Sequence, residues 1–173
     1  EMVENAKPLP IEGVISVGEM ESDLLDFYKN GYPKGITIGI DGIDEHLQLM
    51  PGQFTTVTGI PGSGKSEFVD LIMAKTAITN SWKWAICSFE NHPPSLHASK
   101  ILEKLTGKAF DFRKDVTNRM NEFELEMGMA FMGGYFKFIN VNEVNVSLDG
   151  LLEKTAELVL RNGINGLLID PWN

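Results

Sequence analysis

An eight-residue pattern constrains the fold of this chain more than any other feature of its sequence. Residues 59–66 read G-I-P-G-S-G-K-S, a full match to G-x-x-x-x-G-K-[ST]. The β-branched and aromatic residues 54–58 before it predict a strand, and the apolar spacing after it predicts a helix from Lys65 to about Thr79. Such a glycine-rich turn lets backbone N–H groups face a phosphate, and the helix N-terminus adds positive potential. The sequence therefore predicts a strand, a phosphate-binding loop and a helix in succession.

The residues of this loop are our candidate nucleotide-binding residues. They are Gly59, Ile60, Pro61, Gly62, Ser63, Gly64, Lys65 and Ser66. A lysine in this position reaches the β- and γ-phosphates, so Lys65 is also a candidate catalytic residue, and the hydroxyl of Ser66 is placed to bind Mg²⁺. A chance glycine-rich turn is the alternative, and the flanking strand and helix argue against it. The expected cofactors are ATP, or another nucleoside triphosphate, and Mg²⁺.

Two carboxylates follow apolar segments that predict buried strands. Residues 166–170 end in Asp170, where a Walker B acid would hold the Mg²⁺ shell. Glu90 follows the strand expected at residues 84–89, and parallel strands bring their carboxyl ends to one edge of a sheet. Glu90 is therefore a candidate catalytic base that polarises the attacking water. The alternatives are a turn-initiating role for Asp170 before Pro171 and a solvated loop position for Glu90.

Strands alternate with helices along the chain. Helical spacing and capping residues predict helices at residues 16–29, from Lys65 to about Thr79, from Pro94 to Gly107, from Asn121 to Gly133-Gly134, and from Ser147 to Asn162. Apolar runs predict strands at residues 54–58, 84–89, 135–139 and 166–170. This alternation predicts an α/β fold with a mainly parallel sheet and helices on both faces.

Composition narrows the classes of function. The 173 residues carry 15 basic and 24 acidic side chains, a net charge of −9, so the chain as a whole does not suit coating a polyanion. No apolar run approaches the roughly 18 residues of a membrane helix, and no signal peptide is visible, so no membrane partner is expected. The single cysteine, Cys87, fits a reducing compartment. We interpret it as structural, together with His46, His92 and His97, because their spacing fits no metal site.

A short basic stretch follows Gly107. It comprises Lys108, Arg113, Lys114 and Arg119. A solvated loop is the favoured interpretation, and contact with a nucleic-acid backbone is the alternative. Phe110 and Phe112 between these charges could stack on bases but fit better as packing anchors.

Four stretches, taken in order, carry a resemblance to a known family. They are residues 31–36 leading to 42–44, residues 51–67, residues 82–91 and residues 167–173. Together they resemble the RecA-like motor domain of replicative DNA helicases, in particular the DnaB-like, Twinkle-type primase-helicase branch. The resemblance runs from about residue 9 to Asn173.

The resemblance implies a fold, an activity and partners. It implies a RecA-like P-loop NTPase, ATP-driven translocation on single-stranded DNA during DNA replication, and a homo-oligomeric ring, a hexamer. By this analogy Lys65 and Ser66 bind nucleotide and Mg²⁺, Asp170 is the Walker B acid, and Glu90 is the water-activating base. The helix at 16–29 would match a linker helix that packs on the adjacent subunit. Packing on its own domain is the other interpretation of that helix.

The chain also departs from this family, because it stops at the Walker B position. In RecA-like ATPases the strand between the Walker A and Walker B strands, the arginine finger and the main DNA-contacting loops come later. We therefore expect a fold that is incomplete at the C-terminus, with an arm and linker helix at residues 1–35 and the N-terminal part of the ATPase domain at 36–173. The fragment alone is expected to be inactive, with single-stranded DNA bound mostly by regions that are missing. A strand-wide gap should separate residues 54–58 from 166–170, or another chain should fill that gap.

Two other functions stay open at this point. A nucleotide or nucleoside kinase shares the phosphate-binding loop, but direct pairing of the two strands and phosphate-clamping arginines would be expected, and the chain has only three arginines. A RecA-like module for nucleotide-gated assembly would bind nucleotide without hydrolysing it. The expected location is the cytoplasm of a bacterium or a phage-infected cell, with an organelle as the alternative.

Overall fold

The computed structural model describes residues 11–115, 117–140 and 147–171. It divides into two compact units, Glu1–Lys34 and Gly35–Asn173. The described part of the first unit contains a 3₁₀ turn, η1 (Val17–Met20), followed by α1 (Glu21–Asn30). The backbone N–H of Ser16 donates to the Glu19 carboxylate at 2.7 Å, so the predicted capping interaction opens this helical segment.

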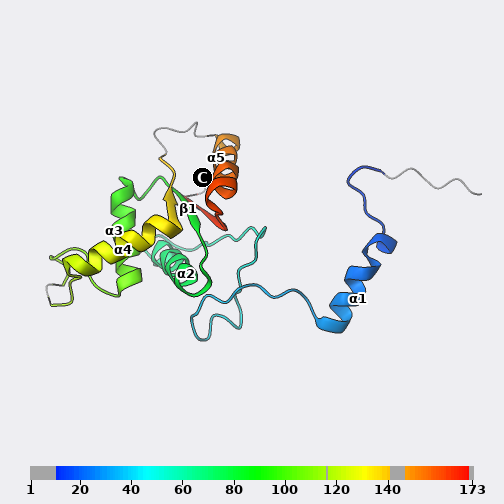
Figure 1. Ribbon diagram of the computed structural model, residues 1–173, viewed down its shortest axis with the longest axis horizontal. Coiled ribbons are helices and arrows are strands. Elements are labelled where there is room, and N and C mark those ends of the chain that lie inside the picture. Colours follow the sequence, from blue (N-terminus) through cyan, green and yellow to red (C-terminus); the bar gives the residue numbers. More distant parts are fainter. Residues whose placement is uncertain (1–10, 116, 141–146, 172–173) are drawn as a thin grey trace, which may run out of the picture. The chain divides into compact units, whose positions relative to one another are not determined.

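The second unit is an α/β structure with a three-stranded, all-parallel sheet (Figure 1). The strands are β1 (Trp84–Ser88), β2 (Phe136–Phe138) and β3 (Gly166–Asp170), in the order β2-β1-β3. The helices of this unit are α2 (Lys65–Asn80), α3 (Pro94–Thr106), α4 (Glu122–Tyr135) and α5 (Leu148–Asn162). The predicted α/β fold class is confirmed, because a small parallel sheet lies between helices.

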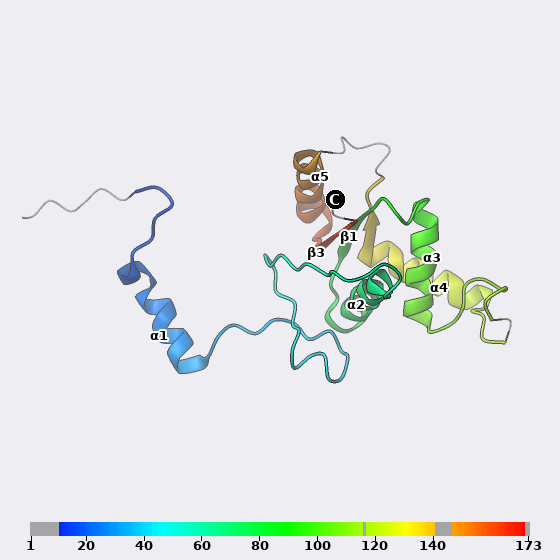
Figure 2. The same ribbon diagram turned by 180° about the vertical axis from the view of Figure 1, so that it is seen from behind.

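Helices cover both faces of the sheet because the side chains of the central strand alternate between two apolar clusters. Trp84 and Ile86 of β1 pack in the larger cluster, to which α2, α3 and α4 contribute. Ala85 and Cys87 pack in the smaller cluster with Leu151 of α5. Figures 1 and 2 show α5 on one side of β1 and the other three helices on the opposite side. Burial raises the pKa of the Cys87 thiol above its ordinary value, which agrees with a structural role.

The helix ends follow the capping residues in most cases. Gly107 closes α3 and Gly163 closes α5 in the left-handed conformation, with φ of 68° and 67°. The hydroxyl of Ser147 accepts the N–H of Gly150 at 3.1 Å at the start of α5. These ends confirm the expected stop and start signals.

The predicted end of α4 at Gly133-Gly134 is wrong. The helix continues to Tyr135, and neither glycine takes a positive φ. Phe131 and Tyr135 lie one turn apart and stack with ring centroids 4.4 Å apart, which supports the last turn across the two glycines. The third strand consequently begins at Phe136, one residue later than expected.

The predicted strand at residues 54–58 is not formed. These residues belong to no ladder in the described part of the chain, and the side chain of Phe54 is 82% exposed. A strand forms only where a neighbour supplies hydrogen bonds to its backbone. Within the described residues β3 pairs with β1 alone, so it has no hydrogen bond to residues 54–58. The direct pairing that would indicate a kinase-type sheet is therefore not found there.

Candidate functional site

The glycine-rich loop at residues 59–64 leads directly into α2. Gly62 and Gly64 take positive φ values of 75° and 85°, which side-chain-bearing residues rarely adopt, and Gly64 is the last residue before the helix. Lys65 is the first residue of α2, and its side chain returns over the loop. Its Nζ donates to the carbonyl oxygens of Gly59 at 2.8 Å and Ile60 at 2.9 Å. The lysine therefore ties the two ends of the loop together.

The space beside the loop explains why a glycine starts it. A Cβ atom at Gly59 would lie 3.3 Å from the Oγ of Ser63 and 3.4 Å from the Cδ of Lys65. A side chain at this position would therefore press on the hydroxyl of Ser63 and contact the side chain of Lys65. Residues 59–64 are otherwise exposed, at the N-terminus of a helix of 16 residues. An open, glycine-lined loop with a lysine folded over it fits a phosphate group.

Asp170 and the residues around Glu90 share one edge of the sheet. Ser88 at the end of β1 lies opposite Asp170 at the end of β3, and the N–H of Phe89 donates to the Asp170 carbonyl at 2.8 Å. Glu90 follows two residues after β1 and is exposed. The two predicted carboxylates thus come from adjacent strand ends, as the parallel sheet requires.

The structure also adds two residues that the sequence did not single out. The Nδ2 of Asn91 donates to the Asp170 carboxylate at 3.4 Å, and its Oδ1 accepts from the Nζ of Lys100 at 2.7 Å. Asn91 could have been noticed as the polar neighbour of Glu90. Lys100 carried no signal, because its position on α3 becomes relevant only when that helix packs beside the strand end.

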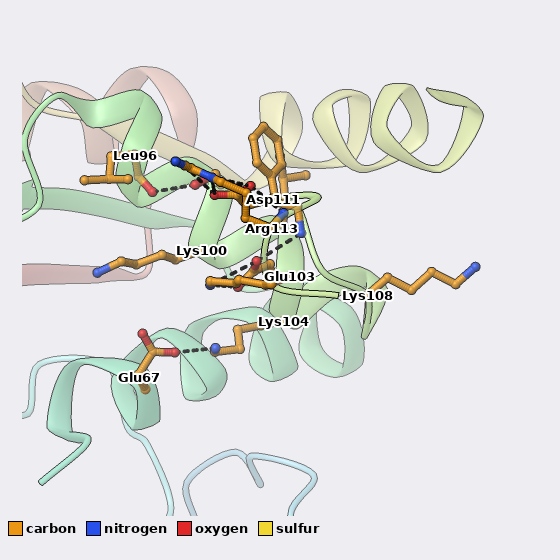
Figure 3. Close-up of polar contacts among 12 residues, drawn as sticks. Glu67, Leu96, Lys100, Glu103, Lys104, Lys108, Asp111 and Arg113 are labelled. Carbon is orange, nitrogen blue, oxygen red and sulfur yellow. Dashed lines mark hydrogen bonds and ion pairs between the residues drawn. The ribbon is translucent and has the colours of Figure 1, made fainter. Parts of the chain in front are cut away.

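Two polar contacts join α2 to α3. The carboxylate of Asp70 on α2 and the Nε2 of His97 on α3 are 2.7 Å apart, and both side chains are 1% exposed. Glu67, which directly follows Ser66, pairs with Lys104 (Figure 3). The hydrogen bond from Lys104 holds the pKa of Glu67 below its ordinary value. These contacts fix the helix that carries the loop, and His97 is structural as predicted.

The basic stretch after Gly107 is already paired within the chain. Lys108 pairs with Glu124, Arg113 with Asp111, and Lys114 with Glu103. The Nε of Arg119 donates to the Phe110 carbonyl at 3.2 Å. Figure 3 shows Arg113 beside its partner Asp111. This arrangement favours a solvated, self-paired loop over a nucleic-acid contact.

The loop and the carboxylates are not joined by direct contacts. Within the described residues no hydrogen bond or ion pair connects Lys65 or Ser66 with Asp170 or Glu90. Nor do three or more histidine, cysteine, aspartate or glutamate side chains gather into a metal-binding group in that part of the chain. The assignment of Ser66 and Asp170 to Mg²⁺ and of Glu90 to catalysis stays a prediction. No helix among the described residues is long and apolar enough to cross a membrane.

The parallel sheet between two helical layers, with a glycine-rich loop opening α2, defines an α/β domain of the RecA-like class. Over all of its length the chain is 36% identical, across 179 aligned residues, to the Twinkle homolog protein, chloroplastic/mitochondrial, of Arabidopsis thaliana. The chain spans about a quarter of that relative, 25% of its length. No family model matches the chain, and no solved structure matches it. This similarity over the whole chain confirms the resemblance to Twinkle-type proteins noted from the sequence.

Proposed function

We propose that this chain is the nucleotide-binding part of the ATP-driven motor of a replicative-type DNA helicase. The observation that carries the proposal is the loop at residues 59–66, with Lys65 folded over it at the start of α2, in a chain similar throughout to a Twinkle homologue. Since the chain spans a quarter of that relative, translocation, DNA binding and ring formation are proposals about the whole protein.

Nucleotide binding would use the loop and its lysine. The backbone N–H groups of residues 62–66 would face the phosphates, and the positive end of α2 would favour their negative charge. The Lys65 ammonium donates to two neutral carbonyl oxygens. A phosphate oxygen is a charged acceptor and gives a stronger hydrogen bond. Exchange of these carbonyls for phosphate would therefore couple nucleotide binding to a change in the loop.

The residues at the strand ends would then serve hydrolysis. Ser66 and Asp170 would hold Mg²⁺, which neutralises charge on the phosphates when bound. Glu90 would orient and deprotonate the attacking water. Its exposed position at the end of β1, one strand away from Asp170, supports that role because both carboxylates belong to the same sheet edge.

The whole protein would act as a ring, a hexamer by the family resemblance, on single-stranded DNA. In such a ring α1 would pack on the adjacent subunit. The name of the relative assigns that protein to chloroplasts and mitochondria. It favours the organellar alternative over the bacterial or phage origin and cytoplasmic location that the sequence first suggested.

The test is ATP hydrolysis by the full-length protein, with and without single-stranded DNA, beside its Lys65→Ala variant. We expect DNA to stimulate hydrolysis strongly, and the variant to lose tight ATP binding, because the ammonium that bridges the loop is gone. A rate of hydrolysis that is the same with and without DNA would contradict the motor function and favour a kinase. Kinase activity would then be tested as phosphate transfer to a nucleoside or nucleotide. Nucleotide binding with no hydrolysis would instead favour a nucleotide-gated assembly.

A further inference from the structure

Asn91 turns inward where its neighbour Glu90 turns to solvent. The side chain of Asn91 lies at the end of β1 and is 8% exposed. Its backbone N–H donates to the Oγ of Ser88 at 3.1 Å. Its side chain contacts Lys100 on one side and Asp170 on the other. A buried amide with a partner on each side has one fixed orientation.

The chemistry of the two partners decides that orientation. A lysine ammonium has only donors, so it requires the Oδ1 atom of the amide. The Nδ2 atom must then face the carboxylate of Asp170, which only accepts. The Lys100 contact, 2.7 Å, is short, whereas the Asp170 contact, 3.4 Å, exceeds the usual range. Lys100 is therefore the stronger anchor, and Asp170 is oriented without being tightly held.

Lys100 differs in this respect from the other cations near α3. Lys104, Lys108 and Lys114 each pair with a glutamate. The partner recorded for Lys100 in the described residues is the neutral amide of Asn91. In Figure 3 its side chain points away from the pair formed by Glu103. The hydrogen bond of Lys100 is therefore made at the strand end, although its charge also helps to lower the pKa of Glu67.

We propose that Asn91, held by Lys100, is a positioning residue that orients the carboxylate of Asp170 toward Mg²⁺ bound with the nucleotide. This inference rests on the proposed function. The Nδ2 contact takes up Oδ2 of Asp170, which leaves Oδ1 for the metal shell. Polarisation of the amide by the ammonium strengthens its N–H as a donor. Without Lys100 the amide oxygen loses its anchor, so the Asn91 side chain can leave its position and the Asp170 carboxylate loses its orientation.

The experiment compares full-length wild type with Asn91→Leu and Lys100→Met. Lys114→Met is the matched control, because it removes the same charge from an exposed ion pair with Glu103 of α3. The dissociation constant of a fluorescent ATP analogue is measured in Mg²⁺ and in EDTA. The ratio of the two constants reports the contribution of the metal, and the value in EDTA reports the loop alone.

In Asn91→Leu and Lys100→Met we expect the Mg²⁺ enhancement of binding to fall by about tenfold, the lower end of the usual effect of a residue that supports a metal ligand. Binding in EDTA should stay at the wild-type value, and Lys114→Met should match wild type in both media. If the ratio of the dissociation constants in EDTA and in Mg²⁺ is unchanged in Lys100→Met, the positioning role is overturned. This result is decisive even if Asn91→Leu does not fold. An equal loss in both media overturns it too, because the effect is then structural.

The same measurement separates the two proposals. Wild-type protein that binds no nucleotide in Mg²⁺ refutes the proposed function and this inference with it. Wild-type protein that binds nucleotide with a clear Mg²⁺ enhancement, beside variants that keep this enhancement in full, refutes only the role of Asn91 and Lys100.

Discussion

The replacement Gly166→Ala tests how closely β3 packs against the Trp84 side chain of β1. Gly166 lies opposite Trp84 in the parallel register. A Cβ atom at Gly166 would meet three carbon atoms of the indole ring at 2.3, 2.5 and 2.8 Å. Carbon atoms pack at about 3.5–4.0 Å, so the ring or the strand must move by about 1 Å. Gly166 has no positive φ, so the backbone itself accepts alanine and the effect isolates the contact with the ring.

The indole ring has little freedom to move away. Trp84 is 8% exposed, and its Nε1 donates to the Oγ1 of Thr76 at 3.0 Å in the buried layer beneath α2. Overpacking of a core costs about 1–3 kcal/mol. Loss of the indole hydrogen bond adds about 1 kcal/mol. We therefore expect Gly166→Ala to lower the free energy of unfolding by about 2–4 kcal/mol.

The assay is equilibrium unfolding in urea, followed by tryptophan fluorescence. Gly133→Ala is the matched control, because its new Cβ meets nothing within 4 Å and it lies inside α4. It should stabilise the protein by up to about 1 kcal/mol. Trp84→Phe removes the ring atoms that clash, so the double variant should lose less stability than the sum of the two single changes. A Gly166→Ala protein within about 0.5 kcal/mol of wild type would refute the reasoning.

Two further predictions concern catalysis and charge. Glu90→Gln should leave nucleotide binding intact and slow hydrolysis by about 10²–10⁴-fold, measured as kcat, because the amide cannot take a proton; normal turnover would exclude Glu90 as the base. The hydrogen bonds from Arg113 lower the pKa of Asp111 from 3.8 to about 2. Because the folded-state pKa is depressed, this pair stabilises the fold above about pH 4 and loses that effect as the pH falls toward 2. In an NMR titration Arg113→Ala should return the pKa of Asp111 toward 3.8, and an unchanged value would show that the arginine is not its cause.

Local signals predicted the helix boundaries well where one residue type sets the backbone. Gly107 and Gly163 end their helices because glycine adopts positive φ without steric cost. The same reasoning failed at Gly133-Gly134, where the stacked rings of Phe131 and Tyr135 support another turn. A glycine permits a helix to end, and the contacts of its neighbours decide whether it does.

The candidate site shows a similar division. The loop residues were recognisable because the pattern is local: glycines that suit the backbone and a lysine six residues after the first of them. Lys100 was not recognisable, since it lies nine residues from Asn91 and meets it only when α3 packs along the sheet. The strand expected at residues 54–58 failed for the same kind of reason, because ladder hydrogen bonds depend on a neighbour that a local pattern does not supply.

By itself, the sequence determined the glycine-rich loop before α2 and the alternation of helices and strands, because backbone preference and apolar periodicity act over a few residues. It also carried the resemblance to Twinkle-type proteins. Only the tertiary structure decided which side chains meet across elements: Asp70 with His97, Trp84 with Gly166, and Lys100 with Asn91 and Asp170. Such contacts depend on the register and packing of whole elements, and these follow from the burial of apolar surface over the entire domain.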